Sequence, residues 1–205
     1  MSDKNVIKVL RSELDFTDSS IDKLKLFHDC LLDYNKKYNL ISKSTENNIW
    51  LRHILDSAQI LKFLDSKKVN NIADFGSGAG FPGLILAIQS NNNGFHVKLY
   101  EKSPVKRDFL NKMKDKLDLK NLEIKGDVYE GRITANIIIC RAFKKLKEII
   151  NISREMIKKP HKIIILKGKD AQTEINNVSL GSNYSYKLEN SITDQDSKII
   201  LVEAK

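Results

Sequence analysis

The sequence predicts an α/β protein: a doubly wound, seven-stranded, mostly parallel sheet with a C-terminal antiparallel hairpin and an N-terminal helical extension. Before residue 66, apolar residues recur at spacings of three and four, which is typical of amphipathic helices. From Val69 onward, short apolar runs alternate with helix-length segments, which is typical of parallel strands joined by crossover helices. The last two runs are joined only by residues 189–197, so we expect them to pair as a hairpin at one edge.

The individual elements follow from the same patterns. Two helical patterns cover residues 24–34 and 49–61, with a polar connection over residues 35–45. Ser103 before Pro104 predicts the start of a crossover helix, with the serine as its N-cap. The strand candidates are residues 71–75, 95–100, 122–125, 135–140, 162–166, 184–188 and 198–203.

Length and composition limit the organisation of the chain. We expect residues 1–65 to form the helical extension and residues 66–205 to form one α/β domain that carries the functional site. The two cysteines, Cys30 and Cys140, lie far apart, which argues against a disulfide framework or a zinc site and indicates a reducing compartment. Because no apolar run reaches the ~20 residues that cross a bilayer, we expect a cytoplasmic protein that does not enter membranes.

A glycine-rich segment follows the first predicted strand and reads Asp74-Phe75-Gly76-Ser77-Gly78-Ala79-Gly80-Phe81-Pro82-Gly83. Glycines let the backbone turn sharply and approach a ligand closely, and a following helix start favours polar or anionic ligand groups. The spacing D-x-G-x-G-x-G resembles the first motif of S-adenosylmethionine-dependent methyltransferases. The residues from Gly78 to Gly83 also fit G-x-G-x-x-G, the pattern of dinucleotide-binding proteins, so a site for an NAD-type cofactor stays an alternative.

Polar residues at the ends of the predicted strands are candidate ligand contacts, because ligands of open parallel sheets bind beyond the carboxyl ends of the strands. Glu101 ends the second strand, where a carboxylate could accept hydrogen bonds from two ribose hydroxyls. Tyr129 and Glu130 follow the third strand, where an adenine could be flanked. Arg141 ends the apolar fourth strand, where a guanidinium is costly unless it meets a carboxylate or phosphate. Lys167 ends the fifth strand and could equally be a solvated lysine.

Upstream of the sheet, the segment Arg52-His53-Ile54-Leu55-Asp56-Ser57 falls within a predicted helix. Helical spacing puts His53 and Asp56 on one face and Arg52 within reach of Asp56. Both an ion pair on the helix surface and an active site fit this spacing. One histidine and one aspartate do not make a metal-ligand set, so we expect no metal site here.

The chain is basic, with a formal net charge of +9 and a pI near 9.4. Its lysines and arginines concentrate in two stretches, one over residues 102–116 and one over residues 141–159. This excess favours a phosphate-bearing partner, although a solvated lysine-rich surface is the simpler interpretation. Charge alone does not separate RNA from DNA, or either from an anionic small substrate.

Several motifs occur together and in order over residues 33–168. They are Tyr38-Asn39-Leu40, the Arg52 to Ser57 helix, the Asp74 to Gly83 loop, Lys106-Arg107, Arg141-Ala142-Phe143 and Leu166-Lys167-Gly168. The combination closely resembles the glucose-inhibited division protein B family, bacterial small-subunit ribosomal RNA (guanine-N7) methyltransferases. The resemblance implies a Rossmann-like methyltransferase fold, with residues 66–205 as the S-adenosylmethionine-dependent methyltransferase domain. It also implies S-adenosylmethionine as co-substrate and ribosomal RNA or the small ribosomal subunit as partner.

The same resemblance implies S-adenosylmethionine contacts at Gly76, Phe81, Tyr129, Glu130 and Arg141. The chain departs from the family in places: a small residue and an acid usually stand at the positions of Tyr129 and Glu130, and a serine stands where Cys140 does. Asp127 is therefore an alternative contact for the adenine.

Chemistry favours the same reaction independently of the resemblance. Guanine N7 carries a lone pair at neutral pH, so attack on a sulfonium methyl group needs alignment and desolvation but no base. Methylation of exocyclic amines usually relies on a D/N-P-P-F/Y/W motif, but Cys140-Arg141-Ala142-Phe143 stands in that place. Cytosine C5 methylation needs a cysteine, commonly after proline, whereas Cys140 follows Ile139.

We therefore expect a monomeric rRNA (guanine-N7) methyltransferase without a metal and without an assigned catalytic residue. Arg52, His53, Asp56 and Lys167 are assigned to substrate positioning. The cofactor contacts expected are Gly76, Gly78, Phe81, Glu101, Tyr129, Glu130 and Arg141. The alternatives are an NAD-type oxidoreductase, a noncatalytic RNA-binding factor on the same fold, and a methyltransferase that acts on a small molecule.

Overall fold

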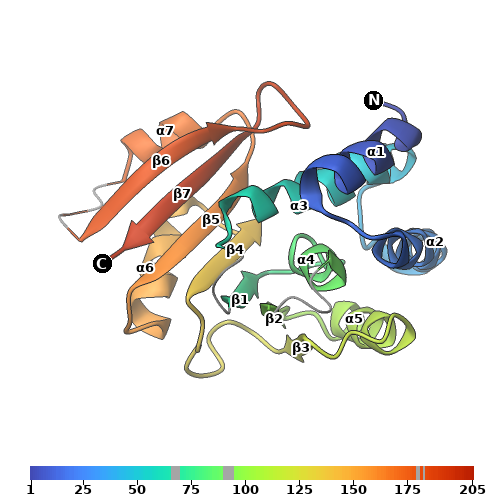
Figure 1. Ribbon diagram of the computed structural model, residues 1–205. Coiled ribbons are helices and arrows are strands. Elements are labelled where there is room, and N and C mark those ends of the chain that lie inside the picture. The colour runs from blue at the N-terminus through green and yellow to red at the C-terminus, as the bar shows by residue number, and fades with distance from the viewer. Residues whose placement is uncertain (66–69, 90–94, 179–180, 182) are drawn as a thin grey trace.

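A computed structural model describes residues 1–65, 70–89, 95–178, 181 and 183–205 (Figure 1). The described residues form a seven-stranded sheet in the order β3-β2-β1-β4-β5-β7-β6. The strands are β1 Asn70–Phe75, β2 Phe95–Tyr100, β3 Leu122–Lys125, β4 Ile137–Arg141, β5 His161–Lys167, β6 Tyr184–Asn190 and β7 Lys198–Ala204. β1 to β5 pair in parallel, whereas β7 is antiparallel to both β5 and β6.

This architecture confirms the predicted fold class, including the antiparallel hairpin at one edge. The strands lie where the apolar runs place them. The largest shifts are of two residues: β4 begins at Ile137 rather than at residue 135, and β6 ends at Asn190 rather than at residue 188. From β1 the chain builds outward to β2 and β3 and then returns to lay β4 on the other side of β1. The carboxyl ends of β1 and β4 therefore flank the switch in strand order, where ligands of such sheets bind.

The helices fall into an N-terminal group and a group that connects the strands. The N-terminal group is α1 Asp3–Leu14, α2 Asp18–Tyr38, the 3-10 helix Lys43–Asn48, the π-helical turns Trp50–Leu55, α3 Asp56–Ala58 and the 3-10 helix Gln59–Phe63. The connecting helices are α4 Gly83–Gln89, α5 Pro104–Lys116, α6 Leu146–Met156 and α7 Ala171–Asn176. Within the described ranges, no helix combines the length and apolar character needed to cross a membrane.

Two local predictions were wrong in part. The connection expected over residues 35–45 starts later, because α2 continues to Tyr38 and ends at Asn39 in the left-handed conformation. The Tyr34 and Tyr38 rings, one helical turn apart, are in contact, and the polar Asn35 is buried. Ser103 does occupy the N-cap position of α5, but its side chain makes no capping hydrogen bond.

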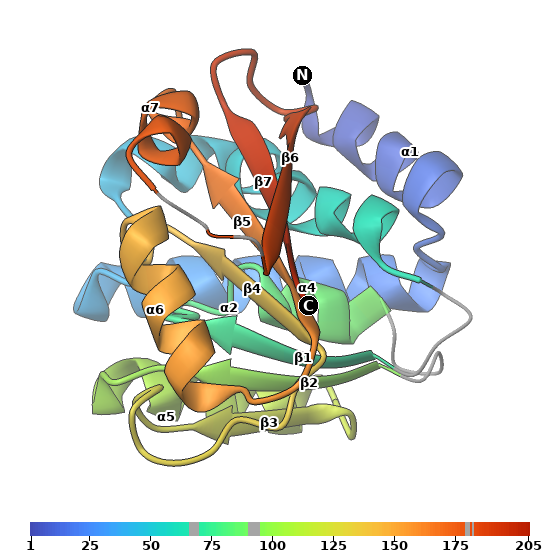
Figure 2. The ribbon, with the colours of Figure 1, turned by 90° about the vertical axis from the view of Figure 1, so that its left-hand side faces the viewer.

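The sheet is covered on both faces, with α6 and α7 on one side and α1 to α5 on the other (Figures 1 and 2). Alternate residues of each strand enter one of two apolar clusters; in β1, for example, Ile72 faces the cluster under α4 and Phe75 faces the one under α6. N-terminal residues such as Leu10 and Phe27 share the cluster under α4. The N-terminal helices therefore pack directly on the sheet. The division between residues 65 and 66 stays a prediction, and Val69 lies outside the described residues.

Candidate functional site

A cavity of about 510 Å³ opens at the carboxyl ends of β1, β2, β3 and β4. This is the position expected for a ligand at a topological switch, and the volume lies in the range of small-molecule sites, ~300–1,000 Å³. Its walls come from the glycine loop, the ends of four strands and the segment after α2. The lining residues are Leu40, Ile41, His53, Gly76, Ser77, Gly78, Ala79, Phe81, Tyr100, Glu101, Lys102, Lys106, Asp127, Val128, Tyr129, Arg141, Ala142, Phe143 and Lys144.

The glycine loop needs its glycines for two different reasons. Gly76, Gly78 and Gly80 have φ of 72°, 58° and 103°, a region that side chains with a Cβ rarely adopt. A Cβ at Gly76 would clash with the ring of Phe143. A Cβ at Gly78 would meet only the carbonyl oxygen of Gly76, at 3.9 Å, so this glycine presents open backbone to the cavity.

Two buried carboxylates hold the loop in this conformation. Asp74, at the end of β1, accepts a hydrogen bond on Oδ2 from the N–H of Gly83, at 2.9 Å. Glu101, just after β2, accepts from the N–H of Gly78 on Oε2 at 2.9 Å and from the N–H of Ser103 on Oε1 at 2.8 Å. Glu101 thus connects the glycine loop to the start of α5 while it lines the cavity. Each carboxylate oxygen of Glu101 has a second lone pair that can accept a hydroxyl, and this contact stays a prediction.

Asp74 is fully buried, and burial raises the pKa of its carboxyl group to about 7. Its Oδ1 atom has no hydrogen-bond partner among the described residues. The carboxylate that fixes the start of α4 is therefore partly protonated near neutral pH.

A second cluster forms around Arg141, which extends from the end of β4 toward the N-terminal helices. Its Nη1 atom donates to the carbonyl oxygen of Arg52 at 2.9 Å and lies 3.4 Å from Asp56 Oδ2. Its Nη2 atom lies 2.6 Å from His53 Nδ1, and the guanidinium carbon stands 5.0 Å from the centre of the Phe81 ring. Of the carboxylate or phosphate that the sequence analysis required for this guanidinium, the structure supplies a carboxylate, Asp56, and a ligand contact of Arg141 stays a prediction.

These contacts define the protonation state of His53. Arginine can only donate, so His53 Nδ1 is the acceptor and Nε2 carries the proton, which points to Thr45 Oγ1 at 2.9 Å. Burial, followed by the charges of Arg141 and Arg52, lowers the pKa of His53 to about 3. The imidazole stacks on Phe81 with ring centres 4.8 Å apart. His53 is therefore neutral near pH 7, and its free lone pair is already occupied by Arg141.

The remaining positioning candidates lie outside the cavity lining. Arg52 pairs with Asp194 in the β6–β7 loop, so the Arg52–Asp56 ion pair that helical spacing allows does not form. Lys167 Nζ donates to Glu174 Oε1 at 2.9 Å and to the carbonyl oxygen of Lys144 at 2.8 Å. These contacts of Lys167 connect the end of β5 to α7 and to the segment before α6.

Of the candidate residues after β3, two line the cavity and one does not. Tyr129 and Asp127 line the cavity; Tyr129 is half exposed, and its N–H donates to Asp127 Oδ1 at 3.3 Å. Glu130 is not among the lining residues, and its carboxylate lies against the backbone of Gly126. The geometry brings Asp127 closer to the candidate site than Glu130.

Several contributors to the site were missed by the sequence analysis. Leu40 and Phe143 line the cavity, Thr45 binds His53, and Thr193 binds Asp56. Leu40 and Phe143 stand within motifs that carry the family resemblance, which was the available signal for them. Thr193 gave no local signal, because its contact with Asp56 spans 137 positions.

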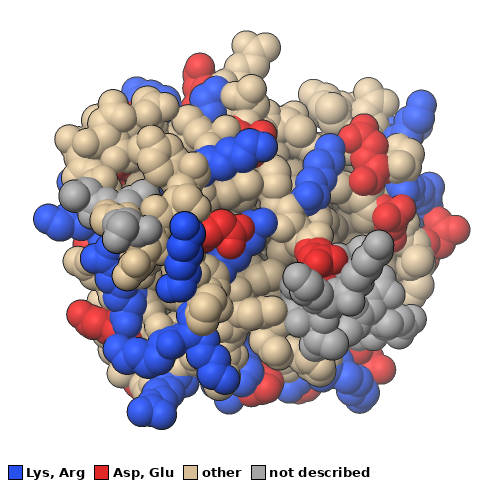
Figure 3. Space-filling view, turned by 60° about the vertical axis from the view of Figure 1, so that its left-hand side comes forward, with Lys and Arg blue, Asp and Glu red and all other residues tan. Residues whose placement is uncertain are grey.

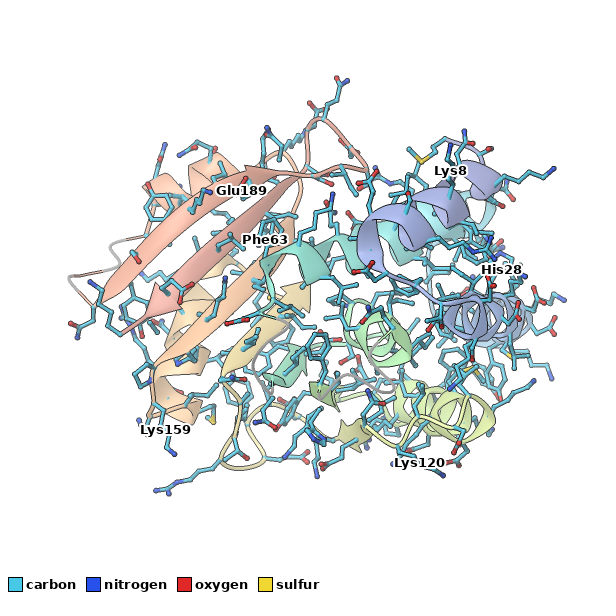
Figure 4. All side chains as sticks on the ribbon, viewed as in Figure 1. Lys8, His28, Phe63, Lys120, Lys159 and Glu189 are labelled. Atoms are coloured by element: carbon cyan, nitrogen blue, oxygen red, sulfur yellow. The ribbon has the colours of Figure 1, made fainter. Side chains whose placement is uncertain are left out.

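The basic residues separate into two regions. Lys102, Lys106 and Lys144 lie at the cavity. Lys158 and Lys159 follow α6, which runs away from the carboxyl ends of the strands, so they lie near the amino ends of the strands, where Figure 4 labels Lys159. Figure 3, in which the left-hand side of Figure 1 is turned forward, shows lysines and arginines gathering at the lower left of the face in view. Across the described ranges, no three potential ligand side chains come together in a way that could hold a metal ion.

Comparison with known proteins identifies close relatives. The family described as rRNA small subunit methyltransferase G (GidB) matches residues 20–199. The protein named Ribosomal RNA small subunit methyltransferase G from Rickettsia felis is 38% identical over 183 residues, covering 89% of this chain and 92% of that protein. The protein of the same name from Rickettsia bellii is 35% identical over 188 residues, covering 91% and 95%.

Solved structures share the fold. A SAM-dependent methyltransferase from Aquifex aeolicus superposes with a TM-score of 0.60 at 15% identity, covering 82% of this chain and 96% of that one. A putative methyltransferase, yhhF, from Escherichia coli gives a TM-score of 0.56 at 15% identity, with 74% and 86% covered. These similarities confirm the Rossmann-like methyltransferase architecture.

The opposite pKa shifts of Asp74 and His53 predict a specific pH dependence of stability. Asp74 holds its proton up to about pH 7 when folded but only to 3.8 when unfolded, so it makes stability fall as pH rises from about 4 to 7. His53 takes up a proton near 6.5 when unfolded but only near 3 when folded, so it makes stability rise with pH from 3 to 6.5. Each contribution reaches at most about 1.4 kcal/mol per pH unit, and in the native protein they oppose each other.

Denaturant unfolding of Asp74→Asn and His53→Gln from pH 4 to 7 checks this. Relative to the native protein, the free energy of unfolding of Asp74→Asn should rise more steeply with pH up to about 6.5. That of His53→Gln should fall with pH. Parallel curves for the two variants would show that neither group is shifted.

Proposed function

The chain belongs to the rRNA small subunit methyltransferase G family, and we propose that it transfers a methyl group from S-adenosylmethionine to N7 of a guanine in small-subunit (16S) ribosomal RNA. The observation that carries the proposal is the cavity at the switch point. There the open backbone of Gly78 faces a cluster of Arg141 and a neutral His53. The wall formed by the glycine loop suits a nucleoside cofactor. The wall around Arg141 and His53 offers hydrogen-bond donors and an aromatic surface to a base.

The residues present fit the cofactor. Gly78 leaves room where a side chain would intrude, Glu101 presents a carboxylate to the cavity, and Tyr129 and Asp127 stand where an adenine is expected. We assign the cofactor contacts to Gly76, Gly78, Phe81, Glu101, Tyr129 and Arg141. Glu130 remains in the assignment only through the family resemblance, and Asp127 is the alternative to it.

Bound S-adenosylmethionine supplies an electrophilic methyl group on its sulfonium. Guanine N7 is an acceptor with a free lone pair, so the protein has to align and desolvate the two partners but not remove a proton. His53 suits a positioning role without proton removal, because it is neutral and its Nδ1 lone pair accepts a hydrogen bond from Arg141. Asp56 offsets the charge of Arg141, which otherwise opposes the positive charge that develops on the methylated base.

A covalent route through Cys140 is disfavoured. This thiol is completely buried in β4, and burial raises its pKa well above the ordinary value. A thiol that is neither accessible nor ionised does not attack a pyrimidine. The chemistry of the site therefore favours direct transfer.

The partner in the proposal is ribosomal RNA, alone or within the small subunit, and we propose that the protein acts as a cytoplasmic monomer. Lys102, Lys106 and Lys144 at the cavity edge are placed to contact phosphates beside a bound nucleotide. Lys158 and Lys159 lie at the opposite end of the sheet and are not assigned to this contact.

The direct test of function is a map of N7-methylguanine in small-subunit rRNA from cells with and without the gene. The proposal expects one modified guanine to be lost with the gene and restored by purified protein with S-adenosylmethionine. Methylation that is unchanged in cells without the gene would contradict the proposal and favour the noncatalytic RNA-binding factor. Binding of NADH in preference to S-adenosylmethionine would support the oxidoreductase alternative.

Gly78→Val should weaken S-adenosylmethionine binding at least tenfold, about 1.4 kcal/mol, because the new side chain enters the cavity. Gly181→Val is the matched control: Gly181 also has a positive φ, 71°, and open space around it, but it lies before β6. Both variants carry backbone strain of about 1–2 kcal/mol, so only the loss of affinity distinguishes them. Calorimetric titration measures the affinity of each variant for S-adenosylmethionine. Equal affinities would show that the glycine loop does not contact the cofactor.

Lys106→Ala should reduce the slope of log affinity for rRNA against log salt by roughly one, because one phosphate contact is lost. Lys8→Ala is the control, since Lys8 is an exposed lysine on α1 (Figure 4). Filter binding from low to physiological salt gives both slopes. The assignment fails if Lys8→Ala changes the slope as much as Lys106→Ala does.

A further inference from the structure

The loop between β6 and β7, residues 191–197, is joined to the helical segment that carries His53 and Asp56. Figure 1 shows this loop reaching over α3 from the edge of the sheet. Gln59, which is almost completely buried, makes the hydrogen bonds that connect the two segments. Its Nε2 donates to Ser191 Oγ at 3.1 Å, and its Oε1 accepts from the N–H of Ile192 at 2.9 Å. A buried amide with both ends bound to one loop fixes the place of that loop.

The same contacts determine the orientation of Asp56. Its Oδ1 atom accepts from Gln59 Nε2 at 2.9 Å and from Thr193 Oγ1 at 2.8 Å. Gln59 Nε2 also reaches the carbonyl oxygen of Asp56, at 3.0 Å. Two donors on Oδ1 leave Oδ2 directed to Arg141.

Asp56 does not line the cavity, but Arg141 does. The 3.4 Å between Asp56 Oδ2 and Arg141 Nη1 is long for a hydrogen bond, so their interaction is mainly that of charges. Its strength depends on where Asp56 is held. Arg141 in turn donates to His53 Nδ1 at 2.6 Å, so the chain of contacts runs from Thr193 to the cavity wall.

We propose that the β6–β7 loop is part of the methyl-transfer apparatus, with Thr193 and Gln59 as positioning residues that hold Asp56 against Arg141. The inference rests on the proposed function. Methyl transfer makes the purine cationic beside the guanidinium of Arg141, and a correctly held Asp56 offsets that guanidinium. Loosening Asp56 therefore affects the transfer step more than the binding of S-adenosylmethionine. Of the assigned cofactor contacts, only Arg141 touches Asp56; the others lie in the glycine loop and after β2 and β3.

The test compares three variants of the loop. Thr193→Val keeps the shape of the side chain but removes the hydroxyl donor, Thr193→Ser keeps the donor, and Gln195→Ala changes an exposed side chain of the same loop. The measurements are the single-turnover rate of methyl transfer to small-subunit rRNA, the Kd of S-adenosylmethionine, and the melting temperature.

We expect Thr193→Val to slow methyl transfer about tenfold while the Kd of S-adenosylmethionine stays within twofold. Thr193→Ser and Gln195→Ala should both remain within twofold of the native rate. The proposal is overturned if Thr193→Val transfers at the native rate or if Thr193→Ser is as slow as Thr193→Val. A parallel loss of cofactor affinity and melting temperature in Thr193→Val would show a merely structural loop.

A spectroscopic measurement separates this inference from the proposed function. The ¹⁵N resonance of His53 Nδ1 reports the hydrogen bond from Arg141 without RNA or cofactor. Thr193→Val should shift it and Gln195→Ala should not, and an unshifted resonance in Thr193→Val overturns the coupling. If the native protein transfers no methyl group but the shift occurs, the proposed function fails while the coupling stands. If Thr193→Val does not fold, the same resonance is read in Ser191→Ala, which removes one acceptor of Gln59.

Discussion

The buried guanidinium of Arg141 is the constraint around which the site is arranged. A cation at the end of an apolar strand is costly unless its donors and its charge meet partners. Here the carbonyl of Arg52 and the imidazole of His53 accept hydrogen bonds, and the carboxylate of Asp56 offsets the charge. All three partners come from the helical segment before the sheet. The N-terminal helices are therefore bound to the sheet at the wall of the cavity. Because Arg141 can only donate, His53 is kept as a neutral acceptor.

The opposite wall is organised by carboxylates. Asp74 and Glu101 accept hydrogen bonds from backbone N–H groups of the glycine loop and of the start of α5, and these bonds hold the loop with Gly78 open to the cavity. The site thus has a frame of carboxyl groups under the cofactor position and a cationic frame beside the base position. Neither frame contains a group arranged to remove a proton, which agrees with a substrate atom that already carries a lone pair.

Most of the fold followed from sequence periodicity, because strands buried on both faces form apolar runs with little ambiguity. Strand-end positions also predicted Glu101, Tyr129 and Arg141 at the cavity, since the ends of parallel strands converge there. Other features depended on partners distant in the chain. Lys167 is held by Glu174 and the Lys144 carbonyl, outside the cavity lining. Thr193 reaches Asp56 only because the edge hairpin folds back over the helices.

The central claim is that the protein positions its substrates and does not deprotonate them. The most direct measurement is the pH dependence of the single-turnover rate at saturating rRNA and S-adenosylmethionine, for the native protein and for His53→Asn. The account predicts a nearly flat rate from about pH 6 to 8 and substantial activity in His53→Asn, which keeps a hydrogen-bonding side chain. An acid limb near pH 6.5 in the native protein that disappears in His53→Asn would contradict it, because His53 would then be acting as a base.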